Sequence, residues 1–179
     1  MKVIFLDIDG VLNTSETFIE RRKNYERTGV FNLEIDEFRL EYLKRIIDIT
    51  GAKIVLSSTW RHFFKKENDK VLPTILKGKK LYDMLMRYGI EIYDKIPTTM
   101  GSREEQIQSW LLNRDDINNF VIIDDEPNMF KELLDKLIIT SKVNNDEMLM
   151  NMDDCFGLCE EHITLAVDML KNKVKIKRQ

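Results

Sequence analysis

Two aspartates follow a short apolar run near the beginning of the sequence. The run covers residues 3–6 and leads into Asp7, Ile8, Asp9 and Gly10. Carboxylates buried at the end of an apolar strand are unfavourable unless a cation or hydrogen bonds compensate their charge. Paired carboxylates can supply a nucleophile, a general acid and base, or ligands for a hard cation. The segment is therefore a candidate reactive site.

Polar side chains also end two other apolar runs. Asp124 and Asp125 end one of them, and Ser57 and Ser58 end another. If these runs are parallel strands, their carboxyl ends meet at the same edge of a sheet. The aspartates gathered there would repel one another, and a hard divalent cation such as Mg²⁺, sharing its coordination with a phosphate, would relieve the repulsion. The hydroxyl and backbone N–H of Ser57 would then donate to that phosphate.

Five apolar runs alternate with amphipathic stretches along the sequence. The runs are too short and too uniformly apolar for half-exposed strands, so we predict a sheet covered on both faces. The expected strands are 2–7, 53–57, 90–93, 119–124 and 136–140, and the expected helices lie near 36–50, 79–88, 102–114, 127–135 and 159–171. This alternation predicts an α/β fold with a doubly wound, Rossmann-like parallel sheet of five core strands, in one domain spanning residues 1–179.

The composition is typical of a globular protein. Of the 179 residues, 43% are hydrophobic and 33% are charged, and the formal net charge of −3 does not exclude a nucleic-acid substrate. Because Asp7 and Asp9 interrupt the first apolar run, we expect neither a signal peptide nor a membrane span, and a cytoplasmic location. Cys155 and Cys159 are expected to be reduced thiols. The composition leaves the oligomeric state open.

Four stretches resemble, in order, the motifs of the haloacid dehalogenase (HAD) superfamily. They are "FLDIDGVLN" (5–13), "IVLSS" (54–58), a basic residue before the last core strands, and "VIIDDEPNMF" (121–130). The ordered set is far more specific than any single stretch. In addition, "SSTWR" (57–61) and "REEQIQSWL" (103–111) are similar to stretches in HAD domains associated with RNA repair. The resemblance implies the strand order 5-4-1-2-3, with strands numbered along the chain.

The resemblance implies a role for each aspartate. Asp7 would be the nucleophile that forms an aspartyl-phosphate, and Asp9 would first protonate the leaving oxygen and then activate water. An oxygen of Asp7, the backbone carbonyl of Asp9, and Asp125 would hold Mg²⁺, with Asp124 supporting them. An acid at position 9 favours a Mg²⁺-dependent phosphatase acting on phosphomonoesters, with nucleotide or nucleic-acid ends among its candidate substrates.

Four residues are expected to bind the substrate phosphate: Ser57, Ser58, Arg61 and Arg103. The third motif of the superfamily usually provides a lysine, and Lys95 and Arg103 both lie before the last core strands. We favour Arg103, in the first turn of an expected helix, because a guanidinium can grip a phosphate with two hydrogen bonds.

Two tryptophans beside these motifs have alternative interpretations. Trp60 follows the phosphate-binding serines, and it either stacks on a base or sugar of the substrate or packs in the core. For Trp110 we favour core packing, because its neighbours are apolar.

The segments between the motifs are short. Residues 13–34 suffice for a small flap but not for a folded cap, and residues 62–101, with a linker at 65–80, leave no room for a large cap. An open site would accept small molecules, polymer ends or phosphoproteins. Basic residues within 21–27 and 65–80 are interpreted as solvated faces rather than as a rim for a polyanion. Two other functions stay open: a protein phosphatase of the small C-terminal-domain phosphatase type, which "DDEPNMF" resembles, and a catalytically silent phosphate-binding module.

Overall fold

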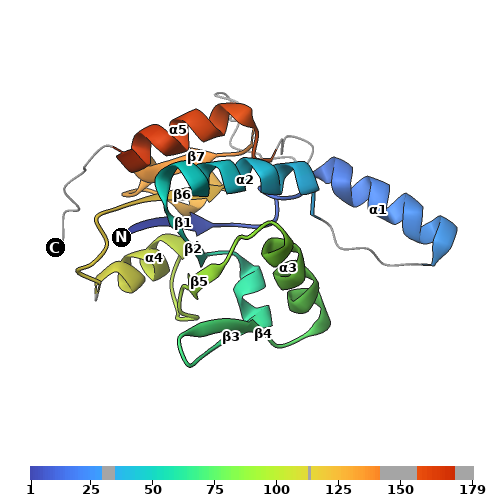
Figure 1. The fold of residues 1–179 in the computed structure, drawn as a ribbon, viewed down its shortest axis with the longest axis horizontal. Coiled ribbons are helices and arrows are strands. Elements are labelled where there is room, and N and C mark those ends of the chain that lie inside the picture. Colours follow the sequence, from blue (N-terminus) through green and yellow to red (C-terminus); the bar gives the residue numbers. More distant parts are fainter. Residues whose placement is uncertain (30–34, 113, 142–156, 172–179) are drawn as a thin grey trace.

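The computed structural model describes residues 1–29, 35–112, 114–141 and 157–171. Its centre is a five-stranded parallel sheet in the order β5-β2-β1-β6-β7 (Figure 1). These strands are β1 (Lys2–Leu6), β2 (Lys53–Leu56), β5 (Ile92–Lys95), β6 (Asn119–Asp124) and β7 (Leu137–Ile139). The parallel sheet and its strand order are confirmed.

Side chains of β1 alternate between two cores, one on each face of the sheet. Ile4 and Leu6 pack with apolar residues of α2 (Glu37–Thr50), α3 (Leu76–Arg87) and α5 (Glu160–Lys171). On the other face, Val3 and Phe5 pack with residues of α4 (Arg103–Leu112). Figure 1 accordingly shows α2 and α5 on one side of the sheet and α4 on the other. Burial on both faces gives the loop after β1 a rigid starting point.

Two of the elements expected from the sequence differ in the structure. The strand expected at 90–93 begins at Ile92, because the N–H of Ile90 donates to the carbonyl of Leu85 at 2.9 Å and closes the end of α3. The helix expected at 127–135 is wrong: the segment contains only two short 3₁₀ turns, Pro127–Met129 and Leu134–Lys136.

A buried carboxylate explains why that helix does not form. Glu104, which is 7% exposed, accepts hydrogen bonds of 2.7 to 3.1 Å from the backbone N–H groups of Lys131, Glu132 and Leu133. In a helix these donors would bind carbonyls one turn earlier. The carboxylate of Glu104 takes the place of those carbonyls and fixes the segment after β6 against α4.

The flap expected at 13–34 contains a helix of its own. This is α1 (Ser15–Thr28), in which Thr14 and Thr17 form a reciprocal capping box and Gly29 ends the last turn. None of its residues is buried, and α1 projects away from the sheet (Figure 1). Residues 30–34 lie outside the described part.

The stretch expected to be a linker is a β-hairpin instead. It consists of β3 (Phe64–Glu67) and β4 (Lys70–Pro73), joined at Asn68 and Asp69, whose φ angles of 48° and 61° suit a tight hairpin turn. The hairpin leads directly into α3. No large cap is present among the described residues.

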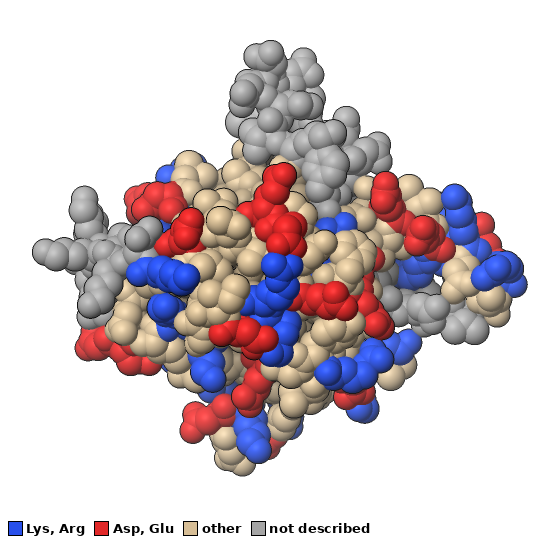
Figure 2. All heavy atoms as spheres, turned by 45° about the horizontal axis from the view of Figure 1, so that its top comes forward, with Lys and Arg blue, Asp and Glu red and all other residues tan. Residues whose placement is uncertain are grey.

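Several basic side chains of the flap and hairpin are paired with acids. Ion pairs join Arg22 to Glu26 at 3.2 Å and Lys66 to Asp94 at 3.0 Å. Figure 2 shows lysine and arginine side chains interspersed with acidic ones over the face it draws. This mixture fits the interpretation of the basic runs as solvated faces.

Two further expectations concern the cysteines and a membrane span. Cys159 is a free thiol, whereas Cys155 lies outside the described residues. No helix in the described ranges combines the length and apolar character needed to cross a membrane.

Candidate active site

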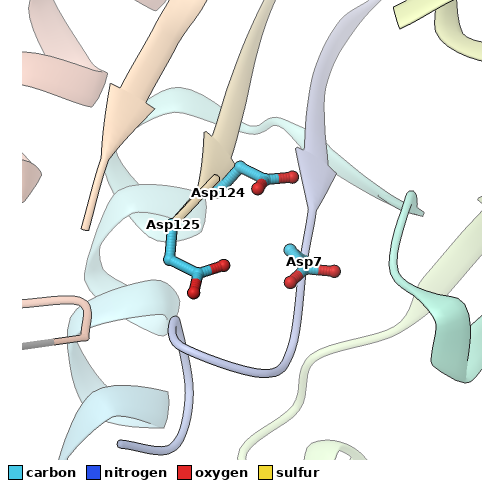
Figure 3. A group of neighbouring side chains, drawn as sticks. All are labelled: Asp7, Asp124 and Asp125. Atoms are coloured by element: carbon cyan, nitrogen blue, oxygen red, sulfur yellow. The ribbon is translucent and has the colours of Figure 1, made fainter. Parts of the chain in front are cut away.

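Three aspartates meet at the carboxyl ends of neighbouring strands. Asp7 follows β1, and Asp124 and Asp125 lie at the end of β6 (Figure 3). Each can offer a carboxylate oxygen within 4.8 Å of those of the other two. The parallel register dictates this meeting, because Leu6 pairs with Ile123 and the N–H of Asp7 donates to the carbonyl of Ile123 at 3.0 Å.

Gly10 allows Asp125 to approach this cluster. Its φ is +71°, and a Cβ atom at this position would lie 2.1 Å from Oδ2 of Asp125. The hydroxyl of Thr140 donates to the carbonyl of Gly10 at 2.8 Å and holds the turn in place. Glycine is therefore required both for the left-handed backbone and for the space that the Asp125 carboxylate occupies.

Arg103 is the cation of the cluster. Its guanidinium lies 3.5 Å from Oδ1 of Asp7, is hydrogen bonded to Asp124, and lies 3.6 Å from Glu126. Burial alone would lower the pKa of Arg103, but the charges of these three acids outweigh burial and raise it. Lys95, the alternative, is directed elsewhere and donates to the backbone carbonyl of Arg61 at 3.2 Å.

The cluster carries more negative charge than Arg103 compensates. Burial raises the pKa of Asp7 well above its ordinary value, against the opposing effect of Arg103; Asp124 and Asp125 raise it further. Burial also raises the pKa of Asp124, again against Arg103. Oxygen ligands that repel one another in this way suit a hard divalent cation.

Three buried side-chain atoms in the described residues have no hydrogen-bond partner: Oδ1 of Asp7, Oγ of Ser57 and Nε of Arg61. All three belong to the ends of β1 and β2 or to the turn just after them. An unpaired buried polar atom costs about 1 to 3 kcal/mol, so such atoms rarely gather by chance. Two of them can donate to an anion, and the third can bind a cation.

The remaining atoms of the second motif are engaged within the protein. The backbone N–H of Ser57, which we expected at the phosphate, instead donates to the carbonyl of Leu6 at 3.0 Å. The Oγ of Ser58 accepts a hydrogen bond from the backbone N–H of Trp60 at 3.3 Å. Arg61 donates through its terminal nitrogens to the carbonyls of Ser57 and Ser58 and to Gln106 of α4, at 2.9 to 3.1 Å.

Asp9 lies beside the carboxylate cluster and is held by two neutral donors. The amide of Asn13 donates to its Oδ1 at 2.9 Å, and the indole N–H of Trp60 donates to its Oδ2 at 2.8 Å. Asn13 also accepts from the N–H of Gly10 at 2.8 Å. Asn13 thus links Asp9 to Gly10 within the turn, a role the sequence-based interpretation missed although an asparagine directly after two apolar residues was a signal.

The two tryptophans donate their indole N–H groups to different aspartates. Trp60 is 1% exposed, so it is a core residue that also contacts the site through Asp9. Trp110 packs edge-on against Phe5, with ring centroids 5.3 Å apart, and donates to Asp94 at 3.1 Å. The core interpretation fits both, and stacking of Trp60 on a substrate does not fit its burial.

A cleft of about 500 Å³ opens over these groups. Its size falls within the usual range for small-molecule sites. Its walls come from the turn after β1, from α1, from the start of α4 and from the segment after β6. The lining residues are Asp7, Asp9, Gly10, Thr14, Ser15, Phe18, Thr59, Arg103, Asp125, Glu126 and Met129.

Comparison with protein families identified a matching family. A family model described as "HAD domain in Swiss Army Knife RNA repair proteins" matches residues 3–144. Comparison with curated proteins found no match, and comparison with solved structures found none either.

Proposed function

Because the chain belongs to the family of HAD domains in Swiss Army Knife RNA repair proteins, we propose that it is a Mg²⁺-dependent phosphatase that hydrolyses phosphomonoesters through an aspartyl-phosphate. The observation that carries the proposal is that three buried side-chain atoms without a hydrogen-bond partner, Oδ1 of Asp7 and the donors of Ser57 and Arg61, all lie just after the ends of the paired strands β1 and β2. A phosphate between them would accept from both donors while Asp7 faces its phosphorus atom.

Asp7 is the nucleophile in this proposal. Its Oδ1 accepts no hydrogen bond within the described residues, so its lone pairs are available to attack. The new bond joins this oxygen to phosphorus, and the bond between phosphorus and the leaving oxygen breaks. Arg103, 3.5 Å from the same oxygen, compensates the negative charge that accumulates as phosphate and carboxylate approach.

Asp9 handles the protons. As a carboxylic acid it gives its proton to the leaving oxygen; as a carboxylate it then takes a proton from the water that attacks phosphorus and releases Asp7. Trp60 and Asn13 fix the position of its carboxyl group through both oxygens.

A magnesium ion fits the arrangement. Asp7 and Asp125 would hold it together with the backbone carbonyl of Asp9, and Asp124, which already binds Arg103, would support them. When bound, Mg²⁺ supplies the positive charge that lets a phosphate approach these carboxylates.

Nucleotide or nucleic-acid ends are the substrates we favour, because the family is named for RNA repair proteins. A protein phosphatase is the second candidate, supported by the absence of a large cap among the described residues, which leaves the cleft open. Phosphate release from 5′- and 3′-phosphorylated oligonucleotides, compared with phosphopeptides, separates the two.

The test of the reaction itself is phosphate release from an aryl phosphate, with Mg²⁺ and with a chelator. We expect release only with Mg²⁺, and a loss of at least about a thousandfold in Asp7→Asn. Asp83→Asn, on the exposed face of α3, is the matched control and should keep full activity. Folded protein that releases nothing with Mg²⁺, or an Asp7→Asn variant as active as wild type, would reject the phosphatase in favour of a silent phosphate-binding module or another chemistry.

A further inference from the structure

The cleft has a charged floor and an apolar rim. We call floor its buried charged lining residues, Asp7 and Arg103, and rim its large apolar lining residues, Phe18 of α1 and Met129 of the turn after β6, which are more exposed. A phosphate uses only the floor. A ligand that also uses the rim must carry an apolar, flat or extended group beside its phosphate.

The two rim residues have little role in the core. Helix α1 buries none of its residues, Phe18 is only half-buried, and Met129 is 41% exposed. Arg21 lies over the Phe18 ring, with its Cζ 5.7 Å from the ring centroid, so it brings a positive charge to the rim. An aromatic ring, a thioether and a guanidinium together suit a ligand in which a flat ring is attached to a negatively charged backbone.

We propose that Phe18 and Met129 form a nucleobase subsite, in which the terminal base of a phosphorylated nucleic-acid end stacks on Phe18 while its phosphate lies at Asp7 and Ser57. The inference rests on the proposed phosphatase function and adds the class of substrate that the phosphatase would select. A sugar phosphate or a phosphoserine would leave the rim uncovered. The ring of a phosphotyrosine is the competing occupant, and the family association with RNA favours the base.

The experiment uses pairs of short oligonucleotides with a 5′- or a 3′-phosphate, in which the terminal residue either keeps its base or is abasic. The value of kcat/KM is measured for wild type, Phe18→Ala, Phe18→Tyr and Ile19→Ala. Ile19 is the matched control because it is the next residue of α1, is 50% exposed and does not line the cleft.

Phe18→Ala should lower kcat/KM for the oligonucleotide with a terminal base by about tenfold to a hundredfold, the usual range for one stacked base. Phe18→Ala should leave kcat/KM for the abasic oligonucleotide unchanged. Phe18→Tyr keeps an aromatic ring and should therefore keep the preference for the terminal base. Ile19→Ala should change kcat/KM for neither oligonucleotide. Equal losses on both oligonucleotides, no loss on either, or a loss confined to a phosphotyrosine peptide would overturn the subsite.

Failure of the subsite and failure of the phosphatase are distinguishable. If wild type releases no phosphate from any oligonucleotide, binding of the same fluorescently labelled pairs in the presence of Mg²⁺ still measures the contribution of the base. A base-dependent affinity that Phe18→Ala abolishes supports the subsite without catalysis. An affinity that is the same with and without the base overturns the subsite even in an active enzyme.

Discussion

The indole nitrogen of Trp60 donates a hydrogen bond to Oδ2 of Asp9, 2.8 Å away, and so links the turn after β2 to the loop after β1. A general acid must hold its proton toward the leaving oxygen, and a fixed carboxyl group does this better than a mobile one. Trp60→Phe removes the donor and keeps an aromatic ring. We expect kcat/KM to fall about tenfold to a hundredfold for an alkyl phosphate, whose leaving oxygen needs a proton, and much less for an aryl phosphate.

Trp110→Phe is the control for this prediction. It removes another buried indole donor, but one that binds Asp94 on the other side of the sheet rather than Asp9. Equal losses on alkyl and aryl phosphates in Trp60→Phe would mean that Trp60 only stabilises the fold.

Gly10→Ala should abolish magnesium binding and activity. The added Cβ would lie 2.1 Å from Oδ2 of Asp125 and would displace that carboxylate. Gly51→Ala is the control, because Gly51 has a similar φ of +67° and nothing within 4 Å of its added Cβ. Both variants should lose about 1 to 2 kcal/mol of stability from backbone strain. Only Gly10→Ala should lose the rise in Tm that Mg²⁺ produces; a normal rise in that variant would contradict Asp125 as a ligand.

Arg103→Ala should lower kcat/KM by at least about a hundredfold, because it removes the cation that faces Asp7, Asp124 and Glu126. Lys95→Ala should change kcat/KM little, since the side-chain ammonium of Lys95 donates to the carbonyl of Arg61 and not to an acid of the cluster. Steady-state kinetics on an aryl phosphate compares the two variants. A larger loss in Lys95→Ala would assign the third motif to the lysine.

The stabilisation by Mg²⁺ should grow with pH. In the metal-free protein the pKa values of Asp7 and Asp124 are raised above 3.8, mainly by burial. The folded chain therefore keeps protons that the unfolded chain releases above that pH, and this contribution to stability is lost as the pH rises through the raised pKa values. Mg²⁺ binds the deprotonated carboxylates, so the difference in Tm with and without Mg²⁺ should rise over the same range and then level off.

Thermal unfolding in a pH series, with Mg²⁺ or a chelator, measures this difference. Asp125→Asn should reduce it at every pH. A difference that stays constant with pH, or that is greatest in acid, would show that the metal does not bind these carboxylates.

The sheet could be predicted from the sequence because a buried strand is identified by residues that are neighbours in the chain. Each apolar run was long enough to identify a buried strand, and parallel strands necessarily bring Asp7 to the same edge as Asp124 and Asp125. The strand order came from the resemblance to a known superfamily and is confirmed.

What the sequence did not predict are contacts between residues far apart in the chain. Glu104 takes the backbone donors of residues 131–133 and prevents a helix that the local pattern favoured. Trp60 reaches Asp9 across 51 positions, which no spacing rule anticipates.

The helix in the flap was missed for a different reason. Helix α1 buries no apolar face, and a buried apolar face is what a periodic pattern detects.

The most direct test of the account is to trap the phosphorylated nucleophile. In Asp9→Asn the release of phosphate from Asp7 should be slow, whereas an aryl phosphate can still phosphorylate Asp7 because its leaving group needs no proton. Mixing this variant with an aryl phosphate and Mg²⁺, quenching in acid and mapping peptides by mass spectrometry should locate a phosphoryl group on Asp7. A phosphoryl group on another residue, or turnover by wild type with no adduct trapped in Asp9→Asn, would contradict the account.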